Sequence, residues 1–208
     1  MAKVVSTLFI ALDGIAEIDF SWHFPYFDEN MGRAVTHDYE GTDVMVFGRV
    51  TYDSFAGAWP EREQAGGEDA PFAKSLGDLR KVVVSHRPLQ FTWRNSEQLQ
   101  GDLVEGVTAL KEDPEVGRIL IAGSISVVQQ LLAAGLVDEL SLLIHPVAAR
   151  HGKRLFDEGD EAYHLNLVRS EVFPTGVIWL TYSPSPKPDE VTYEEVRSKV
   201  SEAPETEG

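Results

Sequence analysis

The chain has 208 residues, of which 43% are apolar, 10% aromatic and 25% charged, as in an ordinary globular protein. It contains no cysteine, which excludes disulfides, thiolate zinc sites, iron–sulfur clusters and a cysteine nucleophile. The formal net charge of −16 repels nucleic acids and anionic lipid surfaces. The sequence shows neither an apolar run of the roughly 20 residues that a membrane span needs nor the cleavage site of a secretory signal. We therefore expect a cytoplasmic protein without nucleic-acid or membrane partners.

Apolar, β-branched runs alternate with helical patterns along the chain. Residues 3–12 form the longest run and close at Asp13-Gly14, which predicts a buried first strand. Residues 57–71 are rich in Gly, Pro, Glu and Ala without periodicity, so we expect a mobile surface loop or flap there. The other predicted elements are helices at 27–37, from 51–55 onward, at 103–111 and at 125–134, and strands at 43–47, 81–85, 118–122, 138–145, 162–173 and 176–183.

The order of these elements predicts the fold class. Strands that alternate with helices form a mostly parallel sheet with helices on both faces, and the last two strands, joined by a hairpin turn at Pro174-Thr175-Gly176, add an antiparallel edge. We expect an α/β, three-layer αβα sandwich with a central mixed, mostly parallel sheet over residues 1–183. Residues 184–208 are acidic and rich in proline at their start, so we expect a disordered tail with one helical stretch near residues 190–200.

Several common signatures are absent from the sequence. It has no Gly-x-Gly-x-x-Gly after the first strand and no phosphate-binding loop of the Gly-x-x-x-x-Gly-Lys-Ser/Thr type, which argues against the usual nucleotide folds. It has no His-Glu-x-x-His, and its six histidines lie in different predicted elements, so we expect no metal site. Ser124 follows a strand but lacks the second glycine of a hydrolase nucleophile elbow, and we interpret it as a helix cap.

Two predicted strands run into helices through small residues, at Gly48-Arg49-Val50-Thr51 and at Ala122-Gly123-Ser124. Ligands of open α/β sheets bind at the carboxyl ends of strands, and the free amides of a helix start attract phosphate. Arg87 supplies a further cation after the strand that ends at Ser85. In a chain this acidic, arginines that directly follow strands indicate an anion site. The alternative is that both glycines serve tight turns and that Arg49 lies on a solvated face.

An ordered set of short motifs resembles a known superfamily. In chain order, the motifs occupy residues 12–14, 47–52, 59–60, 81–85, 123–124, 136–140, 146–147 and 152–156. Together they are similar to the dihydrofolate-reductase-like superfamily, and more closely to stand-alone members of the group typified by the reductase domain of the bifunctional riboflavin-biosynthesis deaminase/reductase. The resemblance covers residues 3–183.

The resemblance implies a sheet of eight strands that binds NADPH across its carboxyl edge. Arg49 and the segment from Ser85 to Arg87 would hold the adenosine 2′-phosphate, which favours NADPH over NADH. Asp13 and Gly14 would lie near the nicotinamide and the substrate, although a turn role after the strand is an equal alternative for Asp13. The cofactor-binding residues implied in this way are Gly48, Arg49, Thr51, Ser85, Arg87, Gly123 and Ser124, with Thr51, Gly123 and Ser124 holding the pyrophosphate.

The substrate side is expected in the aromatic-rich segment before the first predicted helix. Trp22, Phe24 and Phe27 could stack on a flat heterocycle. Asp28 is the nearest match, offset by one residue, to the carboxylate with which dihydrofolate reductases bind a pterin, and Glu29 is its rival. It would help to protonate the ring nitrogen beside the hydride acceptor, provided that aromatic walls raise its pKa. The alternative is that Asp28 only complements the dipole of the helix that follows.

The sequence also departs from the family pattern. Ala122-Gly123 replaces two consecutive glycines, and Arg150 replaces the first glycine of a Gly-x-Gly, so the loop must avoid positive φ at Arg150 or accept strain. No deaminase-type zinc signature precedes the reductase-like region, which excludes the two-step riboflavin enzyme.

Together these features predict an NADPH-dependent reductase of a pterin-, pyrimidine- or related heteroaromatic small molecule. The alternative is a catalytically silent nucleotide-binding or dimeric scaffold with the same fold. Riboflavin-type relatives are commonly dimers, which suggests a homodimer here, and residues 140–147 would supply either its interface or a buried strand.

Overall fold

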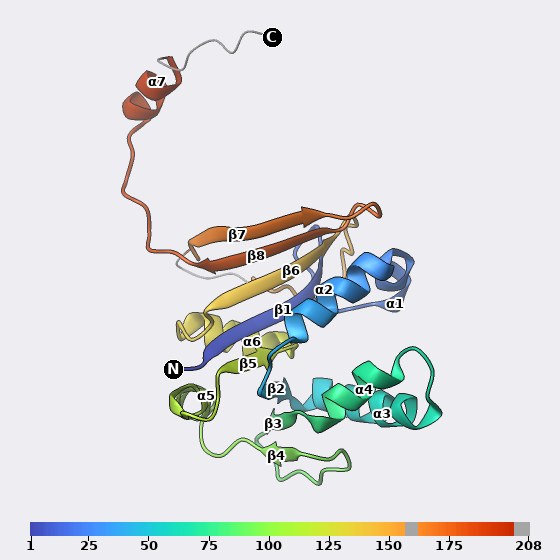
Figure 1. Ribbon diagram of the computed structural model, residues 1–208. Coiled ribbons are helices and arrows are strands. Elements are labelled where there is room, and N and C mark those ends of the chain that lie inside the picture. The colour runs from blue at the N-terminus through green and yellow to red at the C-terminus, as the bar shows by residue number, and fades with distance from the viewer. Residues whose placement is uncertain (157–161, 202–208) are drawn as a thin grey trace.

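The computed structural model describes residues 1–156 and 162–201, and these contain one mixed sheet of eight strands (Figure 1). The strands are β1 Lys3–Ala11, β2 Val44–Gly48, β3 Arg80–Val84, β4 Ser96–Gln98, β5 Arg118–Ile121, β6 Glu139–His145, β7 Leu165–Val172 and β8 Ile178–Pro184. Their order in the sheet is β4-β3-β2-β5-β1-β6-β8-β7. Neighbours are parallel from β4 through β6, and β8 and β7 are antiparallel. The predicted mixed sheet with an antiparallel edge is confirmed, although the short strand β4 was not predicted.

Helices cover both faces of this sheet. They are α1 Phe20–His23, the 3-10 turn η1 Phe24–Tyr26, α2 Glu29–Tyr39, α3 Arg49–Ala65, α4 Ala70–Asp78, α5 Leu103–Glu112, α6 Ile125–Ala133 and α7 Tyr193–Ser201. α2, α3 and α4 lie on one face, and α5 and α6 lie on the other (Figure 1). The three layers of the predicted sandwich are therefore present.

The central strands divide the core between the two faces. In β2, Val44 and Val46 join the apolar cluster formed with α5 and α6, whereas Met45 and Phe47 join the cluster formed with α3 and α4. All residues of β2 are buried, as expected for a parallel strand with helices on both sides.

The prediction of a mobile loop at residues 57–71 is wrong. α3 and α4 occupy this segment except for residues 66–69. Phe55 and Trp59 lie along one side of α3 with their ring centroids 6.2 Å apart, and Trp59 meets Phe72 of α4 at 5.3 Å. These aromatic contacts hold helical structure in a segment whose Gly and Pro content argued against it.

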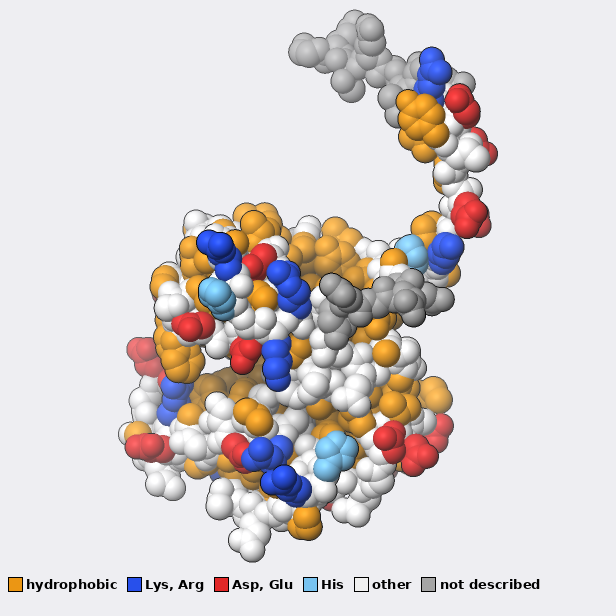
Figure 2. Space-filling view, turned by 180° about the vertical axis from the view of Figure 1, so that it is seen from behind, with side chains coloured by type: hydrophobic (Ala, Val, Ile, Leu, Met, Phe, Trp, Pro, Cys, Tyr) orange, Lys and Arg blue, Asp and Glu red, His pale blue; other side chains and the backbone are white. Residues whose placement is uncertain are grey.

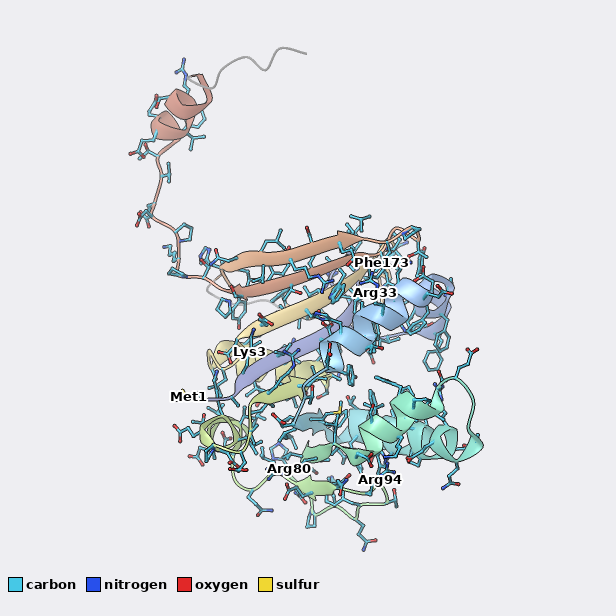
Figure 3. The ribbon with its side chains drawn as sticks, in the orientation of Figure 1. Met1, Lys3, Arg33, Arg80, Arg94 and Phe173 are labelled. Atoms are coloured by element: carbon cyan, nitrogen blue, oxygen red, sulfur yellow. The ribbon has the colours of Figure 1, made fainter. Side chains whose placement is uncertain are left out.

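The two last strands of the sheet differ from β6 in their exposure. β6 lies between β1 and β8, and its Leu140 and Leu143 are buried, so residues 140–147 supply a buried strand rather than an interface. β7 forms the edge of the sheet, and its Val168 and Val172 are 56% and 70% exposed. Figure 2 shows hydrophobic side chains gathered at the top of the body of the molecule, below the C-terminal segment. Figure 3 shows Arg33 of α2 beside the hairpin that joins β7 and β8.

The C-terminal segment leaves the sheet after β8. α7 lies apart from the layers (Figure 1) and matches the helical stretch predicted near residues 190–200. The end of the predicted disordered tail, residues 202–208, falls outside the described residues, and the division at residue 183 remains a prediction. Among the helices of residues 1–156 and 162–201, none is long and apolar enough to cross a membrane.

Candidate active site

The carboxyl ends of β2 and β5 meet because these strands are neighbours in the sheet. The Gly48 amide donates to the Gly123 carbonyl at 3.3 Å. A Cβ on Gly48 would lie 2.3 Å from Ser124 Oγ, and a Cβ on Gly123 would lie 3.2 Å from Thr51 Oγ1. Only glycine allows the first of these approaches, so the two small-residue turns predicted as phosphate sites form one structural unit.

Two helices start at this unit without a side-chain cap. Gly48 is the N-cap of α3 and Ser124 is the N-cap of α6, and neither makes a capping side-chain bond. Ser124 therefore occupies the predicted cap position, but its Oγ lies 3.1 Å from Ser126 Oγ instead of bonding a backbone amide. The peptide between Gly123 and Ser124 is cis. Uncapped N-terminal amides and the helix dipole both favour an anion, so the paired helix starts form an arrangement that favours negative charge.

Basic side chains lie beside these helix starts. A hollow of about 320 Å³ is lined by Arg49, Val84, Ser85, His86 and Arg87. Arg49 Nη1 pairs with Asp53 Oδ2 at 3.0 Å, and both side chains are about half exposed, so an incoming anion can compete for the guanidinium. The structure thus brings Arg49, Ser85 and Arg87 together, as the resemblance implies.

Gln98 is a residue of this site that the sequence did not reveal. From β4 it donates through Nε2 to the carbonyls of Ser85 (2.9 Å) and Arg87 (3.0 Å), and through Oε1 it accepts from the Leu89 amide at 3.1 Å. These bonds fix the loop that carries Arg87. The strand β4 was not predicted, so nothing in the sequence placed Gln98 beside the loop.

A second hollow, of about 500 Å³, lies at the amino ends of β3 and β4. It is lined by Asp78, Arg80, Asn95, Ser96 and Glu97. It carries both signs of charge, and Arg80 Nε already donates to Glu97 Oε1 at 2.6 Å. No helix begins in it. Its size alone does not make it a better phosphate site than the smaller hollow.

Asp13 serves the backbone of a neighbouring loop. Its carboxylate accepts from the amides of Ala149 (3.2 Å) and Arg150 (2.8 Å), and the Arg150 amide is the main reason that the pKa of Asp13 is lowered. Arg150 takes a φ of 65°, so the loop accepts positive φ at the position where the family has glycine. This geometry supports the turn role that was the alternative for Asp13.

The aromatic segment is only partly exposed. Trp22 is 8% exposed, whereas Phe24 and Phe27 are 56% and 47% exposed. Phe24 stacks on Phe20 with ring centroids 4.8 Å apart. Phe24 and Phe27 are therefore exposed enough to contact a flat ligand. Trp22 is buried with its ring centroid 5.1 Å from that of His145, so it is not placed to stack on a ligand as expected.

Asp28 caps α2. Its Oδ1 accepts from the Met31 amide at 3.0 Å, and its Oδ2 accepts from Asn30 Nδ2 at 3.1 Å. The bond from the Met31 amide, followed by that from Asn30, lowers the pKa of Asp28. The acid role required aromatic walls to raise this pKa, and this condition is not met. The geometry fits the alternative role at the helix start.

Replacing Asp28 with asparagine separates capping from proton transfer. Asn caps helices about as well as Asp but has no carboxyl proton to give. Because its pKa is lowered, Asp28 is ionised at neutral pH, and we expect Asp28→Asn to keep the melting temperature, NADPH affinity and turnover. Asp28→Ala should melt earlier above pH 4, and this difference should vanish as the pH falls through the lowered pKa. Reduced turnover of Asp28→Asn at an unchanged melting temperature would restore the acid role.

The sheet order, the paired helix starts and the basic hollow at one edge define an α/β protein of the dihydrofolate-reductase-like fold. The chain belongs to the RibD C-terminal domain family, whose profile matches residues 2–179. An uncharacterized protein of Bacillus subtilis (strain 168), YyaP, is 27% identical over 189 residues, which cover 86% of this chain and 94% of that protein.

Solved structures share the fold at low sequence identity. A putative riboflavin biosynthesis protein from Shewanella sp. PV-4 superposes with a TM-score of 0.70 at 21% identity, over 89% of this chain and 100% of that chain. A pyrimidine reductase-like protein from Corynebacterium diphtheriae gives 0.61 at 15% identity, over 89% and 93%. RibD of Acinetobacter baumannii gives 0.64 at 16% identity, over 89% of this chain and 59% of that one. The family is reductase-like and generally uses a nicotinamide cofactor.

Proposed function

We propose that the protein is an NADPH-dependent reductase that transfers a hydride to a pterin-, pyrimidine- or related heteroaromatic substrate. The observation that carries this proposal is the meeting of two uncapped helix starts with a hollow flanked by Arg49 and Arg87. In a chain with a net charge of −16, such a concentration of anion-binding groups at one sheet edge favours a phosphate-bearing ligand.

The donors at this edge fit the phosphates of NADPH. The hollow beside Arg49, Ser85 and Arg87 offers two guanidinium groups for a 2′-phosphate. Neither Gly48 nor Ser124 caps its helix through a side chain, which leaves the first amides of α3 and α6 for a pyrophosphate. These residues would hold the cofactor, and the bound nicotinamide would supply the hydride.

The protein's own part is to bind, orient and shield. The exposed rings of Phe24 and Phe27 offer apolar walls for a flat heterocycle and exclude water from its face. Asp13 follows β1, and it accepts from the Ala149 and Arg150 amides through its carboxylate and from the Arg154 side chain through its carbonyl. These bonds hold the loop at Ala149 and Arg150 beside the end of β1. Positioning of this kind is what hydride transfer requires from the protein, because the cofactor carries the chemistry.

A catalytically silent nucleotide-binding scaffold is the second candidate. It is favoured by one observation: Asp13 and Asp28, the two carboxylates expected beside the nicotinamide and the substrate, both accept hydrogen bonds from backbone amides. NADPH that binds but is not oxidised with dihydrofolate or flavin-pathway intermediates would support this candidate. The small-molecule partner, the homodimer and the cytoplasmic location remain predictions, and the exposed apolar residues of β7 offer one surface for a dimer.

Replacing Arg49 with alanine tests the proposed cofactor. Loss of a charge-assisted bond to the 2′-phosphate costs about 1.5–3 kcal/mol, so we expect the Kd for NADPH to rise roughly 10- to 150-fold. The Kd for NADH, which lacks this phosphate, should stay nearly constant. Both values can be measured from the quenching of tryptophan fluorescence on titration.

Arg62→Ala is the matched control for this variant. Arg62 lies on the same helix and pairs with Asp69 on the surface, so its loss should leave both Kd values unchanged. Equal weakening of NADPH and NADH by Arg49→Ala would place Arg49 away from the 2′-phosphate. Absence of NADPH binding by the unmodified protein would sink the reductase proposal itself.

A further inference from the structure

Two histidines far apart in the sequence form a buried pair at the carboxyl edge of the sheet. His23 ends α1 and His145 ends β6, and the two residues are 5% and 0% exposed. His23 Nδ1 lies 3.1 Å from His145 Nε2. Aromatic rings enclose the pair. The ring centroid of Phe9 lies 4.3 Å from that of His23, and the ring centroid of Trp22 lies 5.1 Å from that of His145. None of the roles described above uses this pair.

The hydrogen bonds fix the proton positions on both rings. His145 Nδ1 lies 3.0 Å from the Leu143 carbonyl, which can only accept, so this nitrogen carries a proton. Burial lowers the pKa of His145, and burial together with the neighbouring His145 lowers the pKa of His23 to about 4. Both rings are therefore neutral at pH 7. The bare His145 Nε2 must accept from His23 Nδ1, which leaves His23 Nε2 as a bare acceptor.

The free nitrogen of His23 lies beside exposed aromatic rings. The two nitrogens of an imidazole point in different directions, so Nε2 is turned away from His145, and it meets no partner among residues 1–156 and 162–201. Phe24 and Phe27 contact the His23 ring at centroid distances of 5.5 and 5.6 Å, and both are about half exposed. A hydrogen-bond acceptor and flat apolar surfaces therefore occur together on the substrate side.

We propose that His23 Nε2 is the acceptor that recognises an N–H group of a flat nitrogen heterocycle, with His145 as the positioning residue that holds this tautomer. The inference rests on the proposed reductase function and deepens it, because it assigns the substrate a ring with an N–H donor. Phe24 and Phe27 contact the faces of such a ring. A site of this kind discriminates strongly against an analogue without the donor, because the buried acceptor is then left unpaired.

The tautomer is the first measurable consequence. Nitrogen-15 NMR of the full chain at pH 7, without cofactor, distinguishes a bare from a protonated Nε2 in each histidine. We expect a bare Nε2 and a protonated Nδ1 for His23 and for His145. A protonated Nε2 on His23 would overturn the proposal, and this result does not depend on NADPH binding.

Uracil and 1,3-dimethyluracil form a matched pair of probes, because the second lacks both N–H donors. With NADPH present, uracil should shift the His23 Nε2 resonance upfield, and 1,3-dimethyluracil should leave it in place and bind at least tenfold more weakly. The resonances of the exposed His86 should not move with either probe. If NADPH binds while His23 fails to respond to uracil, this inference fails and the proposed reductase function stands.

Two substitutions of His145 separate positioning from packing. His145→Gln keeps an acceptor for His23 Nδ1, whereas His145→Leu removes it. We expect His145→Leu to shift His23 toward the protonated Nε2 tautomer and to lose the uracil response, and His145→Gln to keep both. An unchanged tautomer in a folded His145→Leu protein would show that His145 does not position His23. If His145→Leu does not fold, the His145→Gln spectrum still decides, since loss of the bare Nε2 there contradicts the proposal.

Discussion

Replacing Lys81 with methionine is expected to lower the free energy of unfolding by about 3 kcal/mol, through the loss of hydrogen bonds to buried carbonyls. Lys81 is 0% exposed, although it carries a charged group. Its Nζ donates to the carbonyls of Leu76 and Gly77 at 2.9 Å each and to that of Leu79 at 2.6 Å. The ammonium group therefore satisfies the C-terminal end of α4, where carbonyls have no partner within the helix.

The magnitude follows from the groups that are left without a partner. Asn95 Nδ2 still reaches the Gly77 carbonyl at 3.2 Å, so the loss falls on the carbonyls of Leu76 and Leu79. An orphaned buried carbonyl costs about 1–3 kcal/mol. The ring of Trp93, 4.3 Å from Nζ, also loses its cation. Because methionine is uncharged, the variant no longer has the free-energy cost of burying an ammonium group. The expected loss of stability is therefore near the lower part of the summed range.

The measurement is thermal or urea unfolding of the full chain. For a domain of this size, a loss of about 3 kcal/mol corresponds to a fall of roughly 6–12 °C in melting temperature. Lys74→Met is the control, because Lys74 pairs with Asp78 on the surface and its loss should cost about 1 kcal/mol or less. Equal melting temperatures for the two variants would mean that Lys81 does not stabilise the end of α4.

The burial of Lys81 could not be predicted from its place in an apolar strand. The sequence predicts a strand at residues 81–85, and β3 is observed at Arg80–Val84. The partners of Lys81 belong to α4, which lies mostly beyond the expected loop and was not predicted as a helix. A charged residue can be placed inside only when the carbonyls that receive its protons are known, and these depend on the packing of α4 against α3.

The periodicity of apolar residues predicted the sheet more accurately than the helices of the first half. Buried strands such as β1 read as continuous β-branched runs, which need no partner to be recognised. α3 packs through a few aromatic residues. The Gly and Pro content of residues 57–71 therefore favoured a loop over the helix that the spacing of these aromatic residues indicates. The positions Tyr52, Phe55 and Trp59, three and four residues apart, were the signal for a helix in this segment.

The candidate site was predictable in part because it combines local and long-range features. The helix starts after Gly48 and Gly123 depend on neighbouring residues only, so both turns could be predicted from the sequence around each glycine. Their contact depends on β2 and β5 being neighbours in the sheet, which the order of elements along the chain does not predict. His23 and His145 are 122 positions apart, and neither neighbouring sequence signals the other. Chain topology, which brings these residues together, is the information that local pattern lacks.

Replacing Gly48 with alanine is expected to abolish NADPH binding while the protein stays folded. Gly48 has a φ of −72°, which alanine adopts freely, so backbone strain is not the cause. The added Cβ would lie 2.3 Å from Ser124 Oγ, 2.9 Å from its Cβ and 3.3 Å from its backbone nitrogen. The first turn of α6 must move, and the phosphate-binding amides of the two helix starts then separate. Overpacking of this kind costs about 1–3 kcal/mol of stability.

Two further variants make this prediction specific to the contact. In the double variant Gly48→Ala with Ser124→Gly, the clashing Oγ and Cβ are gone, so NADPH affinity should be largely recovered. Gly32→Ala adds a Cβ with no atom within 4 Å and lies inside α2, so it should raise the melting temperature slightly and leave NADPH affinity unchanged. Fluorescence titration and thermal unfolding supply both readouts. If Gly48→Ala binds NADPH as tightly as the unmodified protein, the two helix starts are not the phosphate site, since the cofactor would tolerate their displacement.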